Sequence, residues 1–317
     1  MELREKYTNS LYAAIAGDAL GVPEDSSTNQ EQSLISVKNI YGYGRYDQPK
    51  GTWSDDSSMI LCTMESLCRG YNIEDIANTL CSWLFDGKWT PHGFVFDSGV
   101  TTFTALESIR SDKKTPYESG CKTEDDNGNG SLMRIIPAAL YFAKKDIADF
   151  LTIIHDISAI THAHPRSKIG CGIYSLFLRN LLAGNDKHAA YTETMKNTQE
   201  YYSVKSEFSS ELSHFDRLLS QTILKAENTK IYSSGYIVHT LETAVWCLMK
   251  HETTKEILQA AVNLGLDTDT NGAAAGGLAG LIYGLDSIPE DWITSLVLYK
   301  DIDELIKKFV SCIISSH

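Results

Sequence analysis

Two oxygen-rich stretches, far apart in the chain, hold the residues best suited to chemistry. The first contributes Ser54, Asp55 and Asp56, and the second contributes Asp267, Asp269 and Thr270. Each stretch stands just before apolar residues at helical spacing, where hydroxyls and acids are also ordinary N-caps that complement the helix dipole. If the two stretches meet in the fold, their oxygens suit a hard divalent cation, Mg²⁺ or Mn²⁺ before Ca²⁺, and do not suit zinc or copper.

Four carboxylates gathered at one point would repel one another strongly unless cations lay between them. Four carboxylates are also enough to hold two ions, and paired ions about 3.5–4 Å apart can orient a substrate and activate water. Separate surface caps that never meet are the alternative interpretation of the same residues.

A further pair of acids follows the first predicted helix. That helix, which includes Tyr7 and Leu11, should end near Gly21 because Pro23 cannot continue it. The next two residues are Glu24 and Asp25. They are either solvated loop acids or carboxylates delivered to a site from a helix end, and their position alone does not separate the two interpretations.

Two more segments have the composition of binding loops. Residues 125–134 place two glycines among Asn and Ser before an apolar run, so that free backbone amides could point at an anion. A turn followed by a helix cap explains this pattern equally well. His162 and His164, just before Pro165, lack the spacing of helical metal ligands. We interpret His162 as a ligand-contacting or hydrogen-bonding residue and His164 as a structural one.

Apolar spacing predicts helices along almost the whole chain, whereas strand signals are sparse. The predicted helices cover roughly residues 7–21, 55–71, 73–85, 99–109, 132–142, 147–160, 165–177, 237–249, 254–264, 271–280 and 302–314. A polar loop is expected over 26–50, an irregular aromatic segment over 89–98, and two exposed helices within 184–236. No internal repeat or linker interrupts the chain, so residues 1–317 are predicted to form one all-α domain.

Small residues dominate the predicted helix that follows the second acidic stretch. Gly272, Gly276 and Gly280 fall on one face of that helix. Glycine costs stability inside a helix, so this face indicates the close approach of a neighbouring helix backbone. Such packing would hold Asp267 and Asp269 rigidly.

The composition is that of a globular chain with a sizeable core, with 43% hydrophobic and 22% charged residues among 317. The formal charge of -13 argues against nonspecific binding to nucleic acid or to an anionic membrane. Seven scattered cysteines without a CxxC pair argue against a disulfide framework or a zinc knot. Without a signal peptide or an apolar run of transmembrane length, we expect a cytoplasmic protein.

Five motifs give the chain a resemblance to the ADP-ribosylglycohydrolases, which remove ADP-ribose from modified dinitrogenase reductase or from arginine. In family order the motifs are Gly17–Pro23, Gly51–Asp56, Asn127–Arg134, Thr161–Pro165, and Asp267–Thr270 with its small-residue helix. Each motif is short, but together they span most of the chain. The resemblance implies an all-helical fold with a two-magnesium centre, or manganese in some members, in a central cleft.

The resemblance also implies roles for individual positions. The metal ligands would be Ser54, Asp55, Asp56, Asp267, Asp269 and Thr270. The diphosphate and the adjacent ribose would be held by Asn127, Gly128, Asn129, Gly130 and Ser131, with His162 nearby. Asp97, in a further family-like motif, would reach the ribose or a water at the metals.

Three positions depart from the family pattern. Ser54 stands where many members have Thr, and Leu266 replaces a usual Gly. In the first motif the family commonly has Gly-x-Pro-x-Glu, whereas here Glu24 and Asp25 follow the proline directly. Either Glu24 reaches the site by a one-residue shift, or the shorter Asp25 is the water-activating carboxylate.

We therefore expect a metal-dependent hydrolase that cleaves the N-glycosidic bond of ADP-ribosylarginine in a modified protein and releases ADP-ribose. Its transition state would be oxocarbenium-like, and the catalytic candidates are Glu24, Asp25, Asp55 and Asp269. We expect the enzyme to act as a monomer.

Three alternatives stay open at the level of the sequence. One is a protein that binds ADP-ribose without turnover, and another is a hydrolase of O-linked ADP-ribose or a related metabolite. The third is a helical metal phosphohydrolase, because His155-Asp156 resembles the His-Asp dipeptide of those enzymes. Only His92 stands upstream as a partner histidine, so we interpret His155 as an ordinary helix residue.

Overall fold

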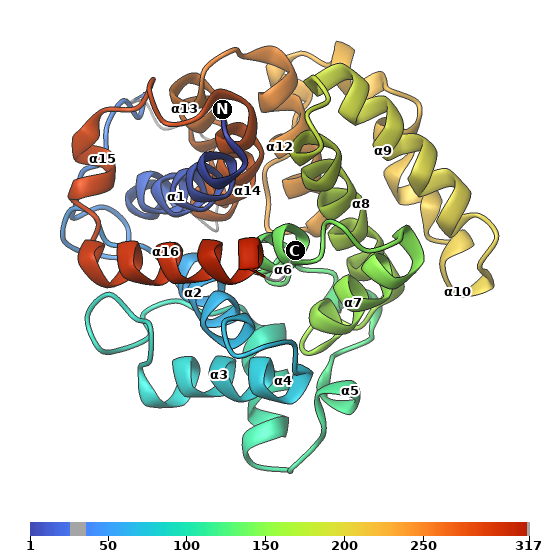
Figure 1. Cartoon of the computed structure of the whole chain (residues 1–317), viewed down its shortest axis with the longest axis horizontal. Coiled ribbons are helices and arrows are strands. Elements are labelled where there is room, and N and C mark those ends of the chain that lie inside the picture. The colour runs from blue at the N-terminus through green and yellow to red at the C-terminus, as the bar shows by residue number, and fades with distance from the viewer. Residues whose placement is uncertain (26–35, 316–317) are drawn as a thin grey trace.

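The computed structural model describes residues 1–25 and 36–315, and within these ranges it consists of helices and loops without a strand element (Figure 1). The longer helices are α1 (Leu3–Gly21), α2 (Asp55–Leu67), α3 (Ile73–Asp86), α4 (Val100–Arg110), α6 (Ile135–Tyr141), α7 (Ile147–Ala159), α8 (Pro165–Leu182), α9 (Lys187–Tyr202), α12 (Ile237–Lys250), α13 (Thr254–Val262), α14 (Thr268–Tyr283) and α16 (Tyr299–Ser315). The shorter ones include η1 (Val22–Glu24), α5 (Pro116–Ser119), α10 (Ser206–Ser209), α11 (Asp216–Leu219) and α15 (Glu290–Thr294). The predicted all-α fold is confirmed.

Most predicted helices lie close to their expected bounds, and two segments differ. The apolar run 132–142 is helical only from Ile135, because residues 127–134 form a loop and turns. Within 184–236 the second expected helix is replaced by short helical turns, which bury Phe208, Phe215 and Leu218 one after another. Of the predicted loop 26–50, positions 26–35 lie outside the described residues, and 36–50 contain no helix.

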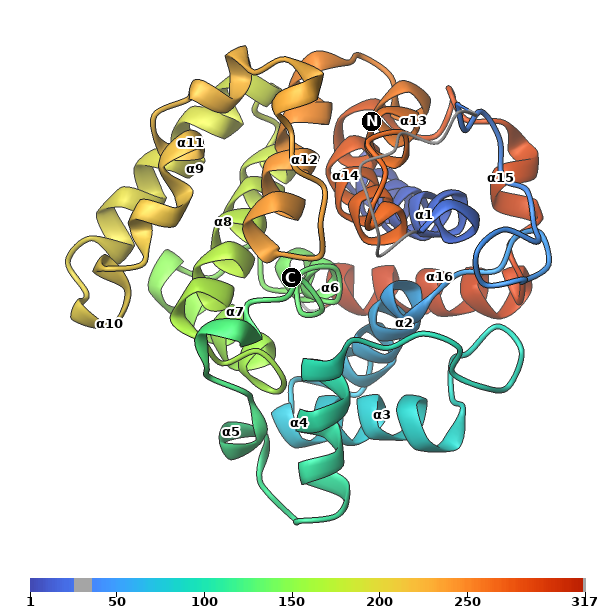
Figure 2. The same cartoon turned by 180° about the vertical axis from the view of Figure 1, so that it is seen from behind.

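Helices α1 and α14 pack against each other along their lengths, and Figures 1 and 2 show them side by side from opposite directions. The predicted glycine face makes this contact. A Cβ added at Gly272 would lie 2.3 Å from the carbonyl oxygen of Gly17, and one at Gly276 would lie 2.1 Å from that of Ala13. Gly280 meets the α1 backbone in the same way one turn further on. The two helices are therefore antiparallel, and the end of α1 lies beside the start of α14.

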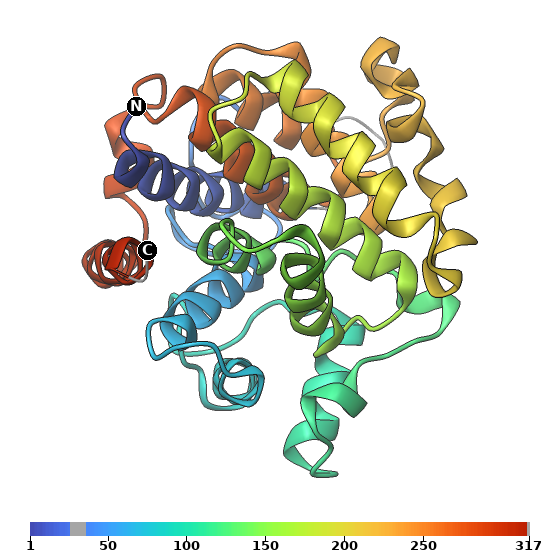
Figure 3. The same cartoon turned by 45° about the vertical axis from the view of Figure 1, so that its right-hand side comes forward.

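The start of α2 packs against the same place. Ser54 caps this helix by accepting a hydrogen bond from the Asp56 amide at 3.3 Å. The Ser54 and Ser57 amides donate to the carboxylate of Asp18 on α1, at 3.0 Å and 2.9 Å. The ends of α1, α2 and α14 thus meet at one point. In another part of the molecule, α8 and α9 pack side by side (Figure 3). Among the described residues no helix combines the length and apolar character needed to cross a membrane.

We predict that Gly276→Ala destabilises the fold, although alanine is the better helix former. Its Cβ would collide with backbone atoms of Ala13 and Ala14, which cannot rotate away, so the free energy of unfolding should fall by about 3 kcal/mol. Gly277→Ala on the same helix is the matched control. Its Cβ meets the ends of the Tyr174 and Ile136 side chains, so we expect a loss of about 1 kcal/mol. Equal midpoints for the two variants in urea unfolding would contradict this packing account.

Candidate metal centre and catalytic cavity

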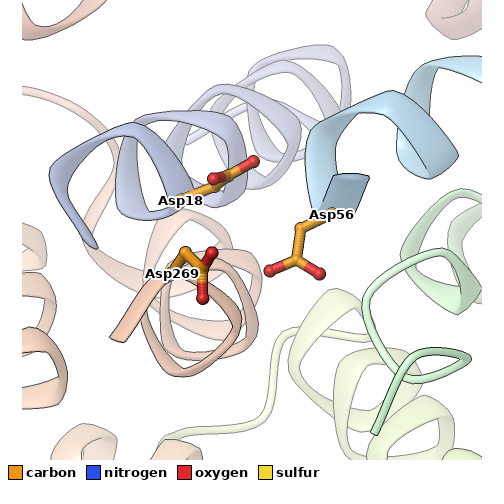
Figure 4. A group of neighbouring side chains, drawn as sticks. All are labelled: Asp18, Asp56 and Asp269. Carbon is orange, nitrogen blue, oxygen red and sulfur yellow. The ribbon is translucent and has the colours of Figure 1, made fainter. Parts of the chain in front are cut away.

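Three aspartates from three helices lie close together at the junction of α1, α2 and α14 (Figure 4). Asp18 lies in the last turn of α1, Asp56 in the first turn of α2, and Asp269 in the first turn of α14. One oxygen from each lies within 4.8 Å of the others, and all three residues are buried. The two acidic stretches, which the sequence left free to meet or to stay apart, therefore meet.

A second group of carboxylates shares Asp269 with the first. Asp25, Asp267 and Asp269 also offer one oxygen each, all within 4.8 Å of one another. Asp25 reaches this position because the turn η1 directly follows α1, and the last residue of α1, Gly21, packs against the backbone at the start of α14. Two adjoining oxygen sets with a common member are the arrangement that a pair of hard cations would need.

Asp18 is a positioning residue that the sequence argument did not select. Beyond the two amides of α2, it accepts the Ser57 hydroxyl at 2.5 Å. Its carboxylate thus satisfies the free N–H groups at the start of α2 and fixes Asp55 and Asp56 in place. The available signal was an acid inside the apolar run 11–20, because a charged side chain in such a run is buried and needs partners.

Asp267 is held by neighbours on other elements. The Asn129 side-chain amide donates to its Oδ2 at 2.5 Å, and its backbone N–H donates to the Ser233 carbonyl at 3.2 Å. The preceding Leu266 has φ of 61°, in the left-handed region that favours glycine. This geometry accounts for the usual glycine at that position, and leucine occupies it here at a conformational cost.

The carboxylates of Asp18, Asp56 and Asp269 are difficult to ionise together when no cation lies between them. Burial raises the pKa of Asp18 to about 6, although hydrogen bonds from Ser57 and Ser54 lower it. Burial and then the charges of Asp55 and Asp18 raise the pKa of Asp56 well above its ordinary value. Burial and then the charge of Asp25 do the same to the pKa of Asp269. Ionising these groups at neutral pH therefore costs free energy in the folded state, and positive charge nearby would offset that cost.

One atom tests whether a cation fits. Oδ2 of Asp56 is buried and has no hydrogen-bond partner among the described residues. A buried carboxylate oxygen without a donor is costly, and a metal ion is one of the few groups that can satisfy it. The donors around it are carboxylates and a Thr270 hydroxyl, with no sulfur or imidazole, so the set fits a hard divalent cation.

A cavity of about 340 Å³ opens over these carboxylates. Its lining includes Asp25, Tyr46, Asp55, Asp56, Asp97, Gly128, Asn129, Gly130, His162, Asp267, Asp269 and Thr270, with the start of α4 and Gly235. This volume is in the range of small-molecule sites, and the lining combines the acidic cluster with the glycine loop. Asp97 therefore shares the cavity with both acidic stretches.

Asp25, and not Glu24, lies in this cavity. Tyr46 donates a hydrogen bond to Asp25 Oδ2 at 2.5 Å, whereas Glu24 bonds the hydroxyl of Tyr41 and does not line the cavity. Of the two carboxylates that the sequence left open, the geometry therefore favours Asp25. The physical reason is the direction of η1, which turns the next residue inward and Glu24 outward. Tyr46 was not anticipated, since it stands in a polar loop without a motif.

Burial raises the pKa of Asp25 to about 6, against the lowering effect of the Tyr46 hydrogen bond. The charges of Asp267 and Asp97 act in the same direction as burial. Burial also raises the pKa of Asp97. Both groups are thus poised to exchange protons closer to neutral pH than an ordinary aspartate.

The glycine loop enters the cavity only in part. Gly128, Asn129 and Gly130 line it, but Asn127 and Ser131 do not. The Asn127 side chain instead accepts from the Ser167 hydroxyl at 3.0 Å and donates to the Glu124 carbonyl. Both side chains, which were expected to contact a ligand, instead anchor the loop in this structure, and a ligand contact for either stays a prediction.

Ser131 is fully buried, and its hydroxyl accepts from Ser158 and contacts the Cys171 sulfur at 3.3 Å. The loop also differs from the expected helix-terminus anion site. Because α6 begins only at Ile135, the loop amides do not belong to the first turn of a helix. Any anion here would meet turn amides and the Asn129 side chain.

The two histidines of the fourth motif differ in position. His162 lines the cavity, and its Nδ1 lies 2.7 Å from the Thr161 hydroxyl. Burial and then the Arg134 charge lower the pKa of His162 to about 3, so its ring is neutral. His164 caps α8 through its Nδ1, as expected for a structural residue.

Ser54 stands behind the cavity and not on its surface. Its hydroxyl accepts the Asp56 amide, which leaves one lone pair for another partner. His155, on α7, is buried and forms a hydrogen bond with the Tyr202 hydroxyl at 2.8 Å. It does not line the cavity that contains the aspartates. These contacts agree with its interpretation as an ordinary helix residue.

The sequence and the fold of this chain are both similar to those of known proteins. The sequence model of the family described as ADP-ribosylglycohydrolase matches residues 1–315. The ADP-ribosylarginine hydrolase Tri1 of Serratia proteamaculans (strain 568) is 26% identical, over 97% of this chain and 79% of its own. The ADP-ribosyl-[dinitrogen reductase] glycohydrolase of Rhodospirillum rubrum is 29% identical, over 93% and 91%.

A human protein, ADP-ribosylhydrolase ARH3, is 24% identical over 95% of this chain and 91% of its own. Among solved structures, an ADP-ribosylglycohydrolase-related protein complex superposes with a TM-score of 0.80 at 26% identity. That similarity covers 98% of this chain and 99% of the solved one. The likeness therefore extends over the whole fold and not over the cavity alone.

The raised pKa values predict how a divalent cation should affect stability. Asp18 and Asp25 have a pKa of about 6 when folded, above the value of about 4 in an unfolded chain. The folded state then binds more protons, so these groups cost nothing below about pH 4 and destabilise fully above about pH 6. A cation that pairs with them removes this cost. We predict that Mg²⁺ raises the Tm, relative to EDTA, more at about pH 8 than at about pH 5.

Thermal melts with matched ionic strength in KCl provide the control for general screening. Surface carboxylates titrate alike in the folded and unfolded states, so they contribute equally to the Tm in Mg²⁺ and in EDTA and cancel in the difference between the two Tm values. A shift that is equal at the two pH values, or larger at the lower one, would contradict the placement of a cation among these aspartates.

Proposed function

This chain belongs to the ADP-ribosylglycohydrolase family, and from that premise we propose that it removes ADP-ribose from arginine in a modified protein, in a divalent-metal-dependent reaction. As a member of the family it is a hydrolase. The bond cleaved would be the N-glycosidic bond between the ribose and the guanidinium. The observation that carries the proposal is the meeting of two carboxylate groups at Asp269, beneath a cavity of ligand size.

We propose that two Mg²⁺, or Mn²⁺, are held by Ser54, Asp55, Asp56, Asp267, Asp269 and Thr270. Asp56, Asp267 and Asp269 belong to the two oxygen sets, together with Asp18 and Asp25, and Asp55 and Thr270 line the cavity beside them. When bound, the ions supply positive charge that orients the ribose hydroxyls and makes water more acidic. The orphan oxygen of Asp56 and the absence of soft donors in this set support Mg²⁺ or Mn²⁺.

Asp25 would act as the general base. Its position in the cavity and its pKa of about 6 leave it largely ionised at neutral pH and able to take a proton from the attacking water. Tyr46 would hold this carboxylate in one orientation through the hydrogen bond to Oδ2. Asp55 and Asp97, also in the cavity, would stabilise positive charge that develops on the ribose ring.

The other side of the cavity would hold the rest of the substrate. The backbone at Gly128 and Gly130 approaches without side chains, and a Cβ at Gly130 would lie 2.9 Å from the Thr102 hydroxyl. That hydroxyl is buried without a partner among the described residues, so it is available to a ligand oxygen. We assign the diphosphate and its adjacent ribose to this loop, with neutral His162 beside it.

Arginine is the proposed leaving group because of charge. An acidic cavity that contains Asp25, Asp55 and Asp97 favours a cationic guanidinium over a neutral serine oxygen. Two of the relatives also bear names that specify arginine or dinitrogen reductase. O-linked ADP-ribose and binding without turnover become outcomes of the test.

A panel of substrates tests the function. Proteins ADP-ribosylated on arginine and on serine are incubated with the protein in Mg²⁺ or EDTA, and released ADP-ribose is measured. We expect release from the arginine-linked substrate in Mg²⁺ and none in EDTA. Release only from the serine-linked substrate would overturn the proposed linkage, and tight binding of ADP-ribose without release would overturn the enzymatic role.

A pair of neighbouring substitutions tests the choice of base. Asp25→Asn should lower kcat about a hundredfold or more, because it removes the proton acceptor while its amide keeps a similar shape. Glu24→Gln is the matched control and should retain kcat within about twofold, because Glu24 is outside the cavity. If Glu24→Gln loses as much activity as Asp25→Asn, or Asp25→Asn loses none, the assignment of Asp25 is wrong.

A further inference from the structure

Exposed apolar side chains run outward from the edge of the cavity. Val100, at the start of α4, lines the cavity and is 82% exposed. Phe103, one turn along the same helix, is 42% exposed, and Phe85 at the end of α3 is 36% exposed. The rings of Phe85 and Phe103 lie with their centroids 6.3 Å apart. We call Val100, Phe103 and Phe85 the apolar rim.

The rim is continuous and begins at the cavity. Residues three apart on a helix lie on the same face, which makes Val100 and Phe103 neighbours. The ring contact then connects Phe103 with Phe85 on α3, whose packing against α4 holds the two in place. Single exposed apolar residues are common, but a contiguous set that leads away from a cavity indicates a surface for interaction.

The proposed substrate defines what must lie there. If ADP-ribose fills the cavity and remains attached to an arginine, the protein that carries this arginine has to cover part of the cavity's edge. Resting on the proposed function, we infer that the apolar rim is a docking surface for the polypeptide of the ADP-ribosylated protein. Of the rim, Val100 lines the cavity but Phe103 and Phe85 do not, so these two phenylalanines would act on macromolecular substrates and not on ADP-ribose itself.

Charge around the rim indicates the chemistry of the partner. Glu107 lies one turn beyond Phe103 on α4 and is exposed, and Asp86 follows Phe85 and is exposed as well. Arg110 pairs with Asp86 at 3.1 Å and lies over the Phe85 ring, so this end of the rim is close to neutral. Glu107 adds a negative charge beside Phe103 and this pair, and Asp97 lines the cavity at the other end of the rim. The complementary partner segment carries an apolar side chain with basic residues around the modified arginine.

The test compares two substrates with the same linkage: a small basic protein ADP-ribosylated on arginine, and free ADP-ribosylarginine. Phe103→Ser should lower kcat/KM for the protein about tenfold and leave kcat/KM for the free amino-acid conjugate within about twofold. Leu3→Ser is the matched control, because Leu3 is also 42% exposed but lies at the far end of α1 from Asp18. It should change neither value.

A second variant changes a charge at an exposed position, where effects on folding are small. Glu107→Lys reverses an exposed charge, and it should reduce kcat/KM for the basic protein more at low than at high ionic strength, again without effect on the small conjugate. Equal losses on both substrates, or no loss on either, would overturn the inference. If the unmodified enzyme releases ADP-ribose from neither substrate, the proposed function itself fails, which is a separate result.

Discussion

Carboxylates that share a buried space repel one another, and each is stable as an anion only when positive charge lies close by. Asp18, Asp56 and Asp269 share such a space, and Asp25 and Asp267 adjoin it. Burial and mutual repulsion raise the pKa values within this set, and one oxygen of Asp56 lacks any partner among the described residues. A fold that brings these groups together without a cation would lose stability at neutral pH. The cluster could therefore hold a metal ion, and we propose that its ligand is a divalent cation.

Close packing between helix backbones holds these carboxylates together despite their repulsion. Glycines on α14 allow it to approach α1 at backbone contact distance, so the ends of the two helices cannot separate easily. Asp18 then secures the start of α2 by accepting its free amide hydrogens. Carboxylates held by three tightly packed helix ends are preorganised, so the proposed binding of an ion would require little rearrangement.

Much of this arrangement could be predicted from the sequence, and the misses have physical causes. Apolar spacing and the Ser54 cap located α2, and the spacing of Gly272, Gly276 and Gly280 predicted the close helix contact. Local sequence does not determine which way a turn directs a side chain. That is why Glu24 and Asp25 could not be separated, and why Ser131 was expected in the cavity when it faces Cys171. Tyr46 and Asp18 act through partners that are distant in sequence, which no spacing rule detects. The monomeric state and the cytoplasmic location stay predictions.

The most direct measurement is a crystal structure of the protein soaked with Mn²⁺, with anomalous diffraction recorded at an energy above the manganese edge. The account predicts anomalous peaks within about 2.5 Å of oxygens of Asp56 and Asp269, with Asp267 or Asp25 bound to a second ion. Anomalous peaks only at surface sites, with the carboxylates of Asp56 and Asp269 turned apart and hydrated, would contradict it.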